Sequence, residues 1–259
     1  MTFEQNIQKL RDNKLEQLIF NENFTINLNN FKLLSSILFD NISLHSLYLY
    51  DIYLGNDIIL ILSKVLEVNK TLTRLTISNN FINNIIPLME VLYCKNKTLI
   101  NLGIHNNSGI DNNSIIAMGK MLKMNNNLQY LQINYNNINT EIIMNALKFN
   151  NTLTSLESYN NLNNNIPFEF NISLIKFNNN NYEITNERND SYNKWIDTEE
   201  YKNTIKQINN EKNFNRKLPY LFMINNYRKY NKVIENELLI KYLLTNAYDD
   251  IITEIMKFI

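Results

Sequence analysis

The residues best suited to catalysis are few, because the chain has two histidines, His45 and His105, and a single cysteine, Cys94. Histidine can act as a general base or a metal ligand near neutral pH, and a cysteine thiolate can act as a nucleophile. Neither histidine has a cluster of Asp or Glu beside it, and one cysteine completes no zinc site. We therefore expect no metal site and no catalytic triad, and we expect Cys94 to be a small packed residue at a helix end.

Paired carboxylates, which could support acid–base chemistry, occur at Glu199–Glu200 and Asp249–Asp250. Both pairs lie in segments with helical periodicity, where the helix dipole favours acidic residues in the first turn. The four glycines are too scattered for a phosphate-binding loop or a dinucleotide fingerprint. The sequence therefore predicts a protein that is not an enzyme and that needs no cofactor.

Charge and cysteine content restrict the partners and the compartment. The 259 residues contain 25 Lys and Arg and 25 Asp and Glu, so no basic excess favours nucleic acid or an anionic membrane. A single cysteine is typical of a reducing compartment, and the first residues lack the apolar core of a secretory signal. We expect a soluble, cytoplasmic, monomeric protein that is rich in asparagine and binds another protein.

An internal repeat is the strongest pattern in the chain. The segment 72–80 has apolar residues at its first, fourth and sixth positions and asparagine at its ninth. Copies of this template follow one another at intervals of 27 to 29 residues over the first five copies, and then at shorter intervals. The first residues of the copies are Leu15, Leu44, Leu72, Leu99, Leu128, Leu153 and the degenerate Leu174.

A second asparagine pattern is in phase with this template. An Asn-x-Ser/Thr-Leu run, or a close variant, introduces most copies, as in 69–72 and 96–99. These runs match the glycosylation sequon, but their phase with the repeat indicates that they are part of the repeat itself.

The repeated Leu-x-x-Leu-x-Leu-x-x-Asn motif resembles that of leucine-rich repeat proteins, and its period is similar to the ribonuclease-inhibitor type. The resemblance implies an α/β horseshoe, or solenoid, in which each unit is a short strand, a turn and a helix. We expect about six to seven such repeats over residues 15–182, with an all-α cap at the C-terminal end.

The residues support this arrangement on physical grounds. In residues 72–80, Leu75 and Ile77 should point inward from a strand, and the ninth-position asparagine can satisfy buried backbone groups of the turn. In residues 57–68, Ile58 and Leu62 share one helical stripe with Val65 and Leu66, and Asp57 is the expected N-cap.

Both ends of the chain depart from the repeat. Residues 1–14 predict an N-terminal capping helix, and residues 183–259 predict a helical C-terminal cap or a small separate module. Within the C-terminal part, helical patterns fall near 196–210, 218–230, 233–245 and 247–258.

The predicted concave face is the most promising binding surface. It should present the third, fifth and seventh residue of each repeat, and tyrosine and arginine are enriched at binding hot spots. We therefore expect a non-enzymatic protein-protein interaction scaffold whose partner-binding residues are Tyr48, Tyr50, Arg74, His105, Tyr130 and Tyr159.

Two alternative functions stay open. The repeat type is shared with the Ran GTPase-activating protein, and this resemblance implies a GTPase regulator as one alternative, although that family usually has more repeats and an acidic tail. Residues 249–259 are similar to the first helix of an F-box, which would make the chain a ubiquitin-ligase substrate adaptor acting through its C-terminal helices. The Leu-Pro pair expected before that helix is replaced by Ala247–Tyr248.

Overall fold

The computed structural model describes residues 2–22, 26–162, 176–178, 198–199 and 202–210. The contacts divide the chain into two units, Met1–Thr198 and Glu199–Ile259. In the second unit, residues 202–210 are helical. The three helices expected beyond residue 217 lie outside the described residues, and the capping role of residues 183–259 stays a prediction.

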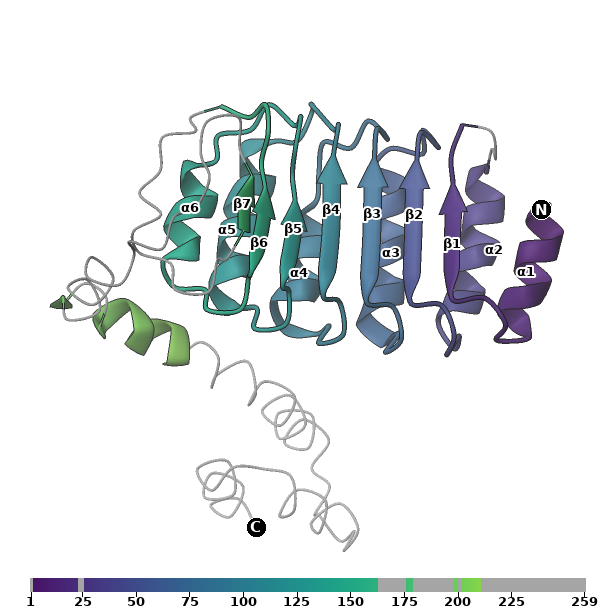
Figure 1. Ribbon diagram of the computed structural model, residues 1–259, viewed down its shortest axis with the longest axis horizontal. Helices are drawn as coiled ribbons and strands as arrows, with labels where there is room; N and C mark the ends of the chain where they lie inside the picture. Colours follow the sequence, from purple (N-terminus) through teal and green to yellow (C-terminus); the bar gives the residue numbers. More distant parts are fainter. Residues whose placement is uncertain (1, 23–25, 163–175, 179–197, 200–201, 211–259) are drawn as a thin grey trace, which may run out of the picture. The chain divides into compact units, whose positions relative to one another are not determined.

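The first unit contains a parallel sheet of seven strands arranged in chain order (Figure 1). Equivalent template positions pair across it, so that Leu47 lies opposite Leu75 and Leu75 opposite Leu102. The strands are β1 (Gln17–Phe20), β2 (Ser46–Tyr50), β3 (Arg74–Ser78), β4 (Asn101–His105), β5 (Tyr130–Gln132), β6 (Ser155–Glu157) and β7 (Lys176–Asn178). Even the degenerate last copy is in register, because Leu156 lies opposite Phe177.

The helices that the structure describes in this unit all lie on one side of the sheet (Figure 1). They are α1 (Phe3–Arg11), α2 (Leu28–Leu38), α3 (Asn56–Val68), α4 (Ile86–Cys94), α5 (Asn112–Met124) and α6 (Glu141–Leu147). A strand followed by a helix, repeated in phase, is the α/β leucine-rich repeat solenoid that the sequence predicted. We call the side of the sheet away from these helices the open face, which is the concave side of the prediction.

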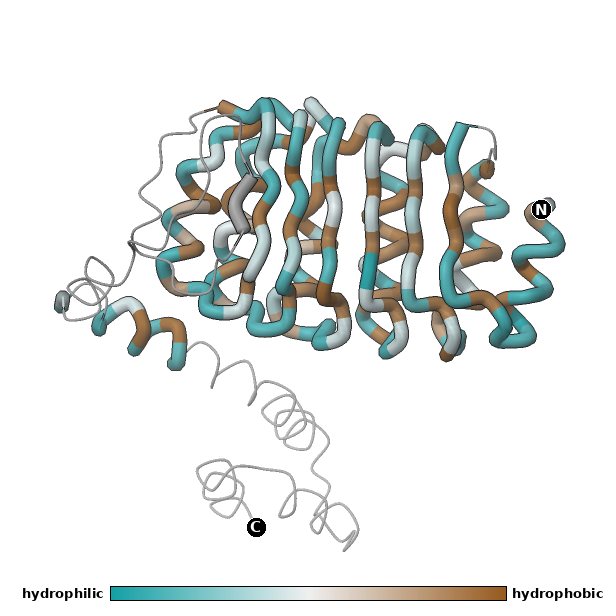
Figure 2. The backbone as a smooth tube through the Cα atoms, viewed as in Figure 1, coloured by the Kyte–Doolittle hydropathy of each residue, from teal (hydrophilic) through white to brown (hydrophobic). Residues whose placement is uncertain are grey.

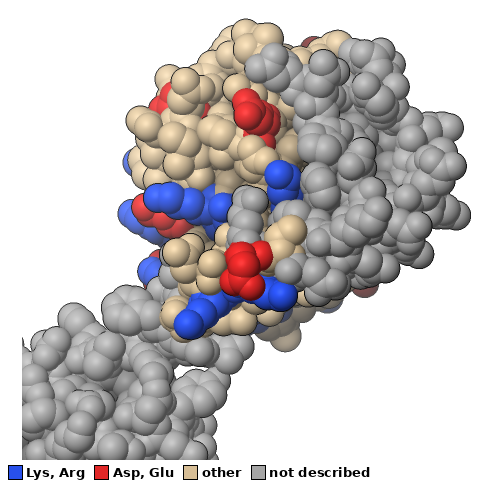
Figure 3. All heavy atoms as spheres, turned by 90° about the vertical axis from the view of Figure 1, so that its left-hand side faces the viewer, with Lys and Arg blue, Asp and Glu red and all other residues tan. Residues whose placement is uncertain are grey.

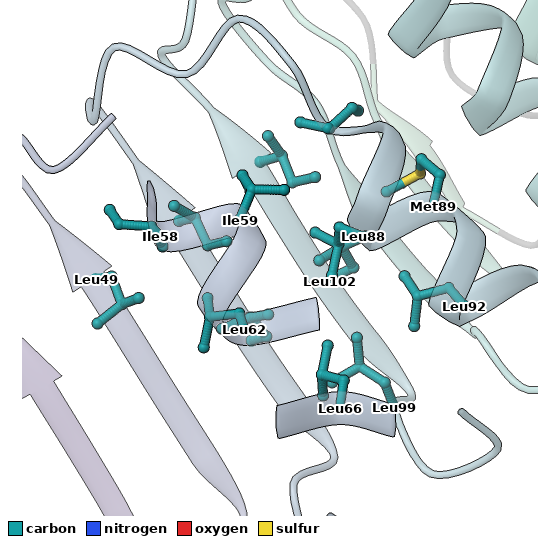
Figure 4. Packing of buried hydrophobic residues seen from close by; sticks show 14 of the residues in the cluster. Leu49, Ile58, Ile59, Leu62, Leu66, Leu88, Met89, Leu92, Leu99 and Leu102 are labelled. Atoms are coloured by element: carbon teal, nitrogen blue, oxygen red, sulfur yellow. The ribbon is translucent and has the colours of Figure 1, made fainter. Parts of the chain in front are cut away.

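One continuous apolar core fills the space between sheet and helices. Hydrophobic and polar residues alternate along the strands (Figure 2), and Leu75 and Ile77 are buried as expected. Figure 4 shows side chains from α3, α4 and the strands meeting in this layer, among them Leu62, Leu88 and Leu102. Because each helix packs on the next along the stack, no single repeat holds a core of its own.

The ninth-position asparagines form a ladder at the edge where the strands end. The Asn80 amide oxygen accepts hydrogen bonds from the backbone N–H groups of Ile52 and Tyr53, at 3.0 and 3.1 Å. Its amide nitrogen donates to the carbonyl oxygens of Leu49 and Ser78. Similar bonds are made by Asn107 and Asn136, and all three amides are buried. The ladder therefore satisfies the turn backbone, as predicted.

The second asparagine pattern forms another ladder at the opposite edge. Each side-chain nitrogen donates to a carbonyl at the end of the preceding repeat's helix, as from Asn69 to Leu38 at 2.6 Å and from Asn96 to Leu66 at 2.8 Å. Each side-chain oxygen accepts from the backbone two and three residues further on. Burial of these amides explains why the sequons belong to the repeat and are closed to glycosylation in the folded state. The ladder residues are Asn41, Asn69, Asn96, Asn125 and Asn150.

Two local predictions were wrong. The N-cap of α3 is Gly55, at a φ of 57°, and Asp57 lies inside the first turn. The chain enters this helix through a left-handed residue, where glycine avoids the clash of a Cβ atom. Cys94 does end α4, but its side chain is exposed rather than packed, and it faces away from the core stripe of Leu88 and Leu92.

Candidate functional site

An aromatic cluster lies on the open face over β2, β3 and β4. The rings of Tyr48 and Tyr50 are stacked with their centroids 6.1 Å apart, and the ring of Tyr50 lies 6.4 Å from that of His105. Between them, the Ser78 hydroxyl and His105 Nδ1 share a hydrogen bond of 2.9 Å. The two tyrosines and His105 are half-buried, so each ring is held in place and still presents a surface to a partner.

A second cluster surrounds Glu157 on the next strands. The Tyr130 hydroxyl donates to one oxygen of the Glu157 carboxylate at 2.5 Å, and Gln132 donates to the other at 3.0 Å. Asn134 donates to that second oxygen at 3.4 Å, and its own side-chain oxygen accepts from the backbone N–H of Tyr159. Three donors thus fix one carboxylate between β5 and β6.

Gly103 separates the two clusters. It occupies the fifth template position on β4, between Thr76 of β3 and Gln132 of β5. A Cβ atom at this position would come within 3.1 Å of the Thr76 side chain and 3.3 Å of the Gln132 amide oxygen. The neighbouring side chains therefore close over the glycine, and a larger residue there would require the side chains of Thr76 and Gln132 to shift.

The structure places all six predicted partner-binding residues on repeats of the sheet, but it does not bring all of them together. Tyr48, Tyr50 and His105 form one group, and Tyr130 lies in the other with Tyr159 beside it. Arg74 is exposed at the first residue of β3, and none of the contacts that build the two clusters includes it.

The organising role of Glu157 was missed. Its fifth position in the template places it on the predicted concave face, but the prediction was based on the enrichment of tyrosine and arginine at binding hot spots, which does not select a carboxylate. The signal available in the sequence was the lone carboxylate among the outward positions of the first six repeats, next to two amides and two tyrosines in equivalent positions.

Burial controls the protonation of these groups. Burial lowers the pKa of His105, and the nearby Glu157 carboxylate offsets part of that effect by raising it. Burial also raises the pKa of Tyr50, with a smaller contribution from Tyr48. For Tyr130, burial, the hydrogen bond to Glu157 and the negative charge of Glu157 raise the pKa far above its usual range. Tyr50 and Tyr130 are therefore neutral phenols, and His105 is a neutral imidazole, near neutral pH.

The lowered pKa of His105 predicts that the folded protein loses stability in acid. A histidine whose pKa is lower in the folded state than in the unfolded state, where it is about 6.5, contributes stability above that value. This contribution is lost as the pH falls from about 6.5 through the folded pKa. We expect the free energy of unfolding to fall less between about pH 7 and about pH 5 in His105→Gln than in the parent protein. Equilibrium urea unfolding at several pH values measures this slope.

Asn126→Gln is the control, because it replaces an exposed residue that carries no ionisable group and should keep the parent's pH slope. An unchanged slope in His105→Gln would contradict the effect of burial on the imidazole.

The described residues contain neither a candidate metal site nor a candidate membrane-spanning helix. They contain no group of three or more His, Cys, Asp or Glu side chains that could hold a metal ion. None of their helices is long and apolar enough to cross a bilayer. On the face drawn in Figure 3, Lys and Arg side chains lie beside Asp and Glu side chains, and neither sign forms a continuous patch there.

Comparison with known proteins gives no family assignment. No protein-family model and no curated protein matches the sequence. Among solved structures, actin-binding site 2 of leiomodin-1 is similar over 51% of this chain and 79% of its own, at 22% identity and a TM-score of 0.48. The tropomodulin C-terminal domain from Caenorhabditis elegans is similar over 51% of this chain and 83% of its own, at 15% identity and a TM-score of 0.45. Similarity at this level does not bear on function.

Proposed function

We propose that the protein is a non-enzymatic interaction module that binds a partner protein through the open face of its leucine-rich repeat solenoid. The observation that carries this proposal is the fixed, half-exposed group of Tyr48, Tyr50 and His105, with its centroid distances of 6.1 and 6.4 Å. The complete proposed patch is Tyr48, Tyr50, Arg74, His105, Tyr130 and Tyr159.

Rigid aromatic side chains suit this role for an energetic reason. A tyrosine ring contributes a large contact area and a polar tip, and only a few such residues dominate the affinity of most interfaces. Stacking and hydrogen bonds already hold these rings before binding, so little side-chain entropy is lost when a partner arrives. A surface of this kind favours a partner with complementary apolar and hydrogen-bonding groups.

The proposed patch lacks the excess of positive charge that favours a nucleic acid, because its one arginine, Arg74, is balanced by the Glu157 carboxylate of the second cluster. The hydrogen-bonded Glu157 carboxylate lies in the second cluster, and phosphate groups would be repelled by it. His105 stays neutral near pH 7 and adds no positive charge.

The test is affinity capture from lysate with the intact chain and with the variant Tyr48→Ala/Tyr50→Ala/Tyr130→Ala. We expect the variant to keep its circular dichroism spectrum and melting cooperativity, because the three side chains lie outside the apolar core. Partner binding, remeasured with the purified partner, should weaken by more than about tenfold.

The matched control removes exposed apolar side chains of the helices instead, as in Leu60→Ala of α3 and Ile116→Ala of α5, both of which lie outside the open face. Equal losses in the two variants would reject the open face as the binding surface. Unfolding of the triple variant would instead show that these tyrosines support the core.

The captured partner also separates the two alternative functions. A GTPase that requires the three tyrosines would support a GTPase regulator. Partners that are kept by the triple variant and lost on deletion of residues 183–259 would support the ligase adaptor, whose F-box-like segment at residues 249–259 lies outside the described residues.

A further inference from the structure

Exposed aromatic residues line a second surface, at the edge of the sheet where the strands end. Tyr53, Phe81 and Tyr135 lie in the loops after β2, β3 and β5, with exposed fractions of 55%, 72% and 51%. The rings of Tyr53 and Phe81 are stacked across neighbouring repeats, with their centroids 5.4 Å apart. We call these three residues the aromatic edge.

The aromatic edge conflicts with local backbone preference. All three residues have a positive φ, between 54° and 56°, a conformation that bulky side chains rarely adopt and that asparagine adopts more readily. In this asparagine-rich chain, Asn137 occupies the position equivalent to Tyr53 and Phe81, and Asn106 the position equivalent to Tyr135. The rings therefore occupy strained positions and remain exposed to solvent, which predicts a role in binding rather than in folding.

The charges around the aromatic edge have one sign. In the described loops and first helical turns at this edge, the charged residues are all acidic, with no Lys or Arg among them. The Tyr53 hydroxyl lies 3.4 Å from a carboxylate oxygen of Asp51, and Glu22 of the preceding repeat is near enough to act on the same hydroxyl. The acidic residues of this edge are Glu22, Asp51, Asp57, Asp111 and Glu141.

The opposite edge has a different character. Its loops, between each helix and the next strand, contain Lys14, Lys70, Lys95, Lys97 and Lys148 beside a smaller number of acids. The zero net charge of the chain thus conceals a separation of charge across the solenoid.

We propose that the aromatic edge docks a Lys- or Arg-rich segment of a partner protein. A guanidinium or ammonium group stacks on the face of the Tyr53–Phe81 pair, while the carboxylates of Asp51 and Glu22 pair with neighbouring positive charges. Aromatic faces attract cations, and the acidic loops strengthen that attraction and select a basic partner over an acidic one. This surface is separate from the open face, and the proposal does not depend on the function proposed for that face.

The test uses a fluorescein-labelled peptide of alternating Arg and Gly, and a second peptide in which citrulline replaces each Arg. Citrulline keeps the shape of the side chain and removes its charge. Fluorescence anisotropy with the full chain should show binding of the Arg peptide that weakens as salt is raised, and binding of the citrulline peptide that is at least about tenfold weaker. Equal binding of the two peptides would overturn the proposal.

Variants locate the site. Tyr53→Asn/Phe81→Asn installs the residue that the chain itself uses at Asn137, so we expect an undiminished melting temperature and about tenfold weaker peptide binding. Asp51→Asn/Glu22→Gln should weaken binding to a similar extent.

Two controls keep the proposal falsifiable. Glu90→Gln removes an exposed carboxylate from α4, on the helical side, and should leave peptide binding unchanged. The triple variant of Tyr48, Tyr50 and Tyr130 should also bind the peptide normally. A comparable loss in Glu90→Gln would show unspecific attraction to negative charge, and a loss in the triple variant would place the peptide on the open face; either result would overturn the proposal.

Discussion

Leu75→Asp should unfold the middle of the solenoid. Leu75 is 1% exposed in β3, where it lies opposite Leu47 and Leu102 in the adjoining strands. An aspartate there loses the burial of the leucine side chain and places a carboxylate without a partner in an apolar layer. We expect a loss of about 5 kcal/mol or more, which is comparable to the whole stability of many domains. Circular dichroism and limited proteolysis measure the outcome.

The neighbouring Thr76→Asp is the matched control. Thr76 follows Leu75 in the same strand but points to the open face, where it is only partly buried. Its replacement should change the free energy of unfolding by no more than about 1 kcal/mol. Similar losses in the two variants would show that the assigned inward and outward directions of β3 are wrong.

Asn80→Ala should have the second-largest effect. Asn80 is fully buried, and its amide makes hydrogen bonds with four backbone groups: the N–H of Ile52 and Tyr53 and the carbonyls of Leu49 and Ser78. Alanine leaves these groups without that partner in a site closed to water. Because each unsatisfied buried polar group costs about 1–3 kcal/mol, we expect a loss of roughly 3 kcal/mol or more. Urea unfolding followed by fluorescence provides the value.

Asn126→Ala provides the comparison for this variant. Asn126 is exposed and lies outside both ladders, so its loss should alter stability by less than about 0.5 kcal/mol. A small effect in Asn80→Ala, similar to that of Asn126→Ala, would show that the ladder does not hold the turns.

The repeat made the architecture predictable from sequence alone. Residues in equivalent template positions meet the same requirements in every copy, so the register of Leu47, Leu75 and Leu102 followed from aligning the copies. The first residues of the helices were harder to predict than the strand register. The sequence offers Asp57 as an acceptable N-cap, but the backbone enters α3 through Gly55. Cys94 was placed correctly at a helix end, but a boundary does not determine which way the last side chain faces.

The site was predictable only as a set of positions. The template placed Tyr48, Tyr50 and His105 on one face, but the Ser78–His105 bond joins residues 27 positions apart in the sequence. The three donors to Glu157 also come from the preceding repeat, and no local pattern shows that they converge. Likewise, the balanced charge along the chain hides the acidic aromatic edge, because the acids gather only when the repeats stack.

Hydroxyl-radical footprinting of the complex with the captured partner tests the central claim most directly. Oxidation of each tyrosine is measured by mass spectrometry in the free and bound protein, which compares residues of one type on different surfaces. Binding through the open face predicts reduced oxidation of Tyr48, Tyr50, Tyr130 and Tyr159, with no change at Tyr93 of α4 on the helical side. Protection of Tyr93 while the four open-face tyrosines keep their reactivity would contradict the account.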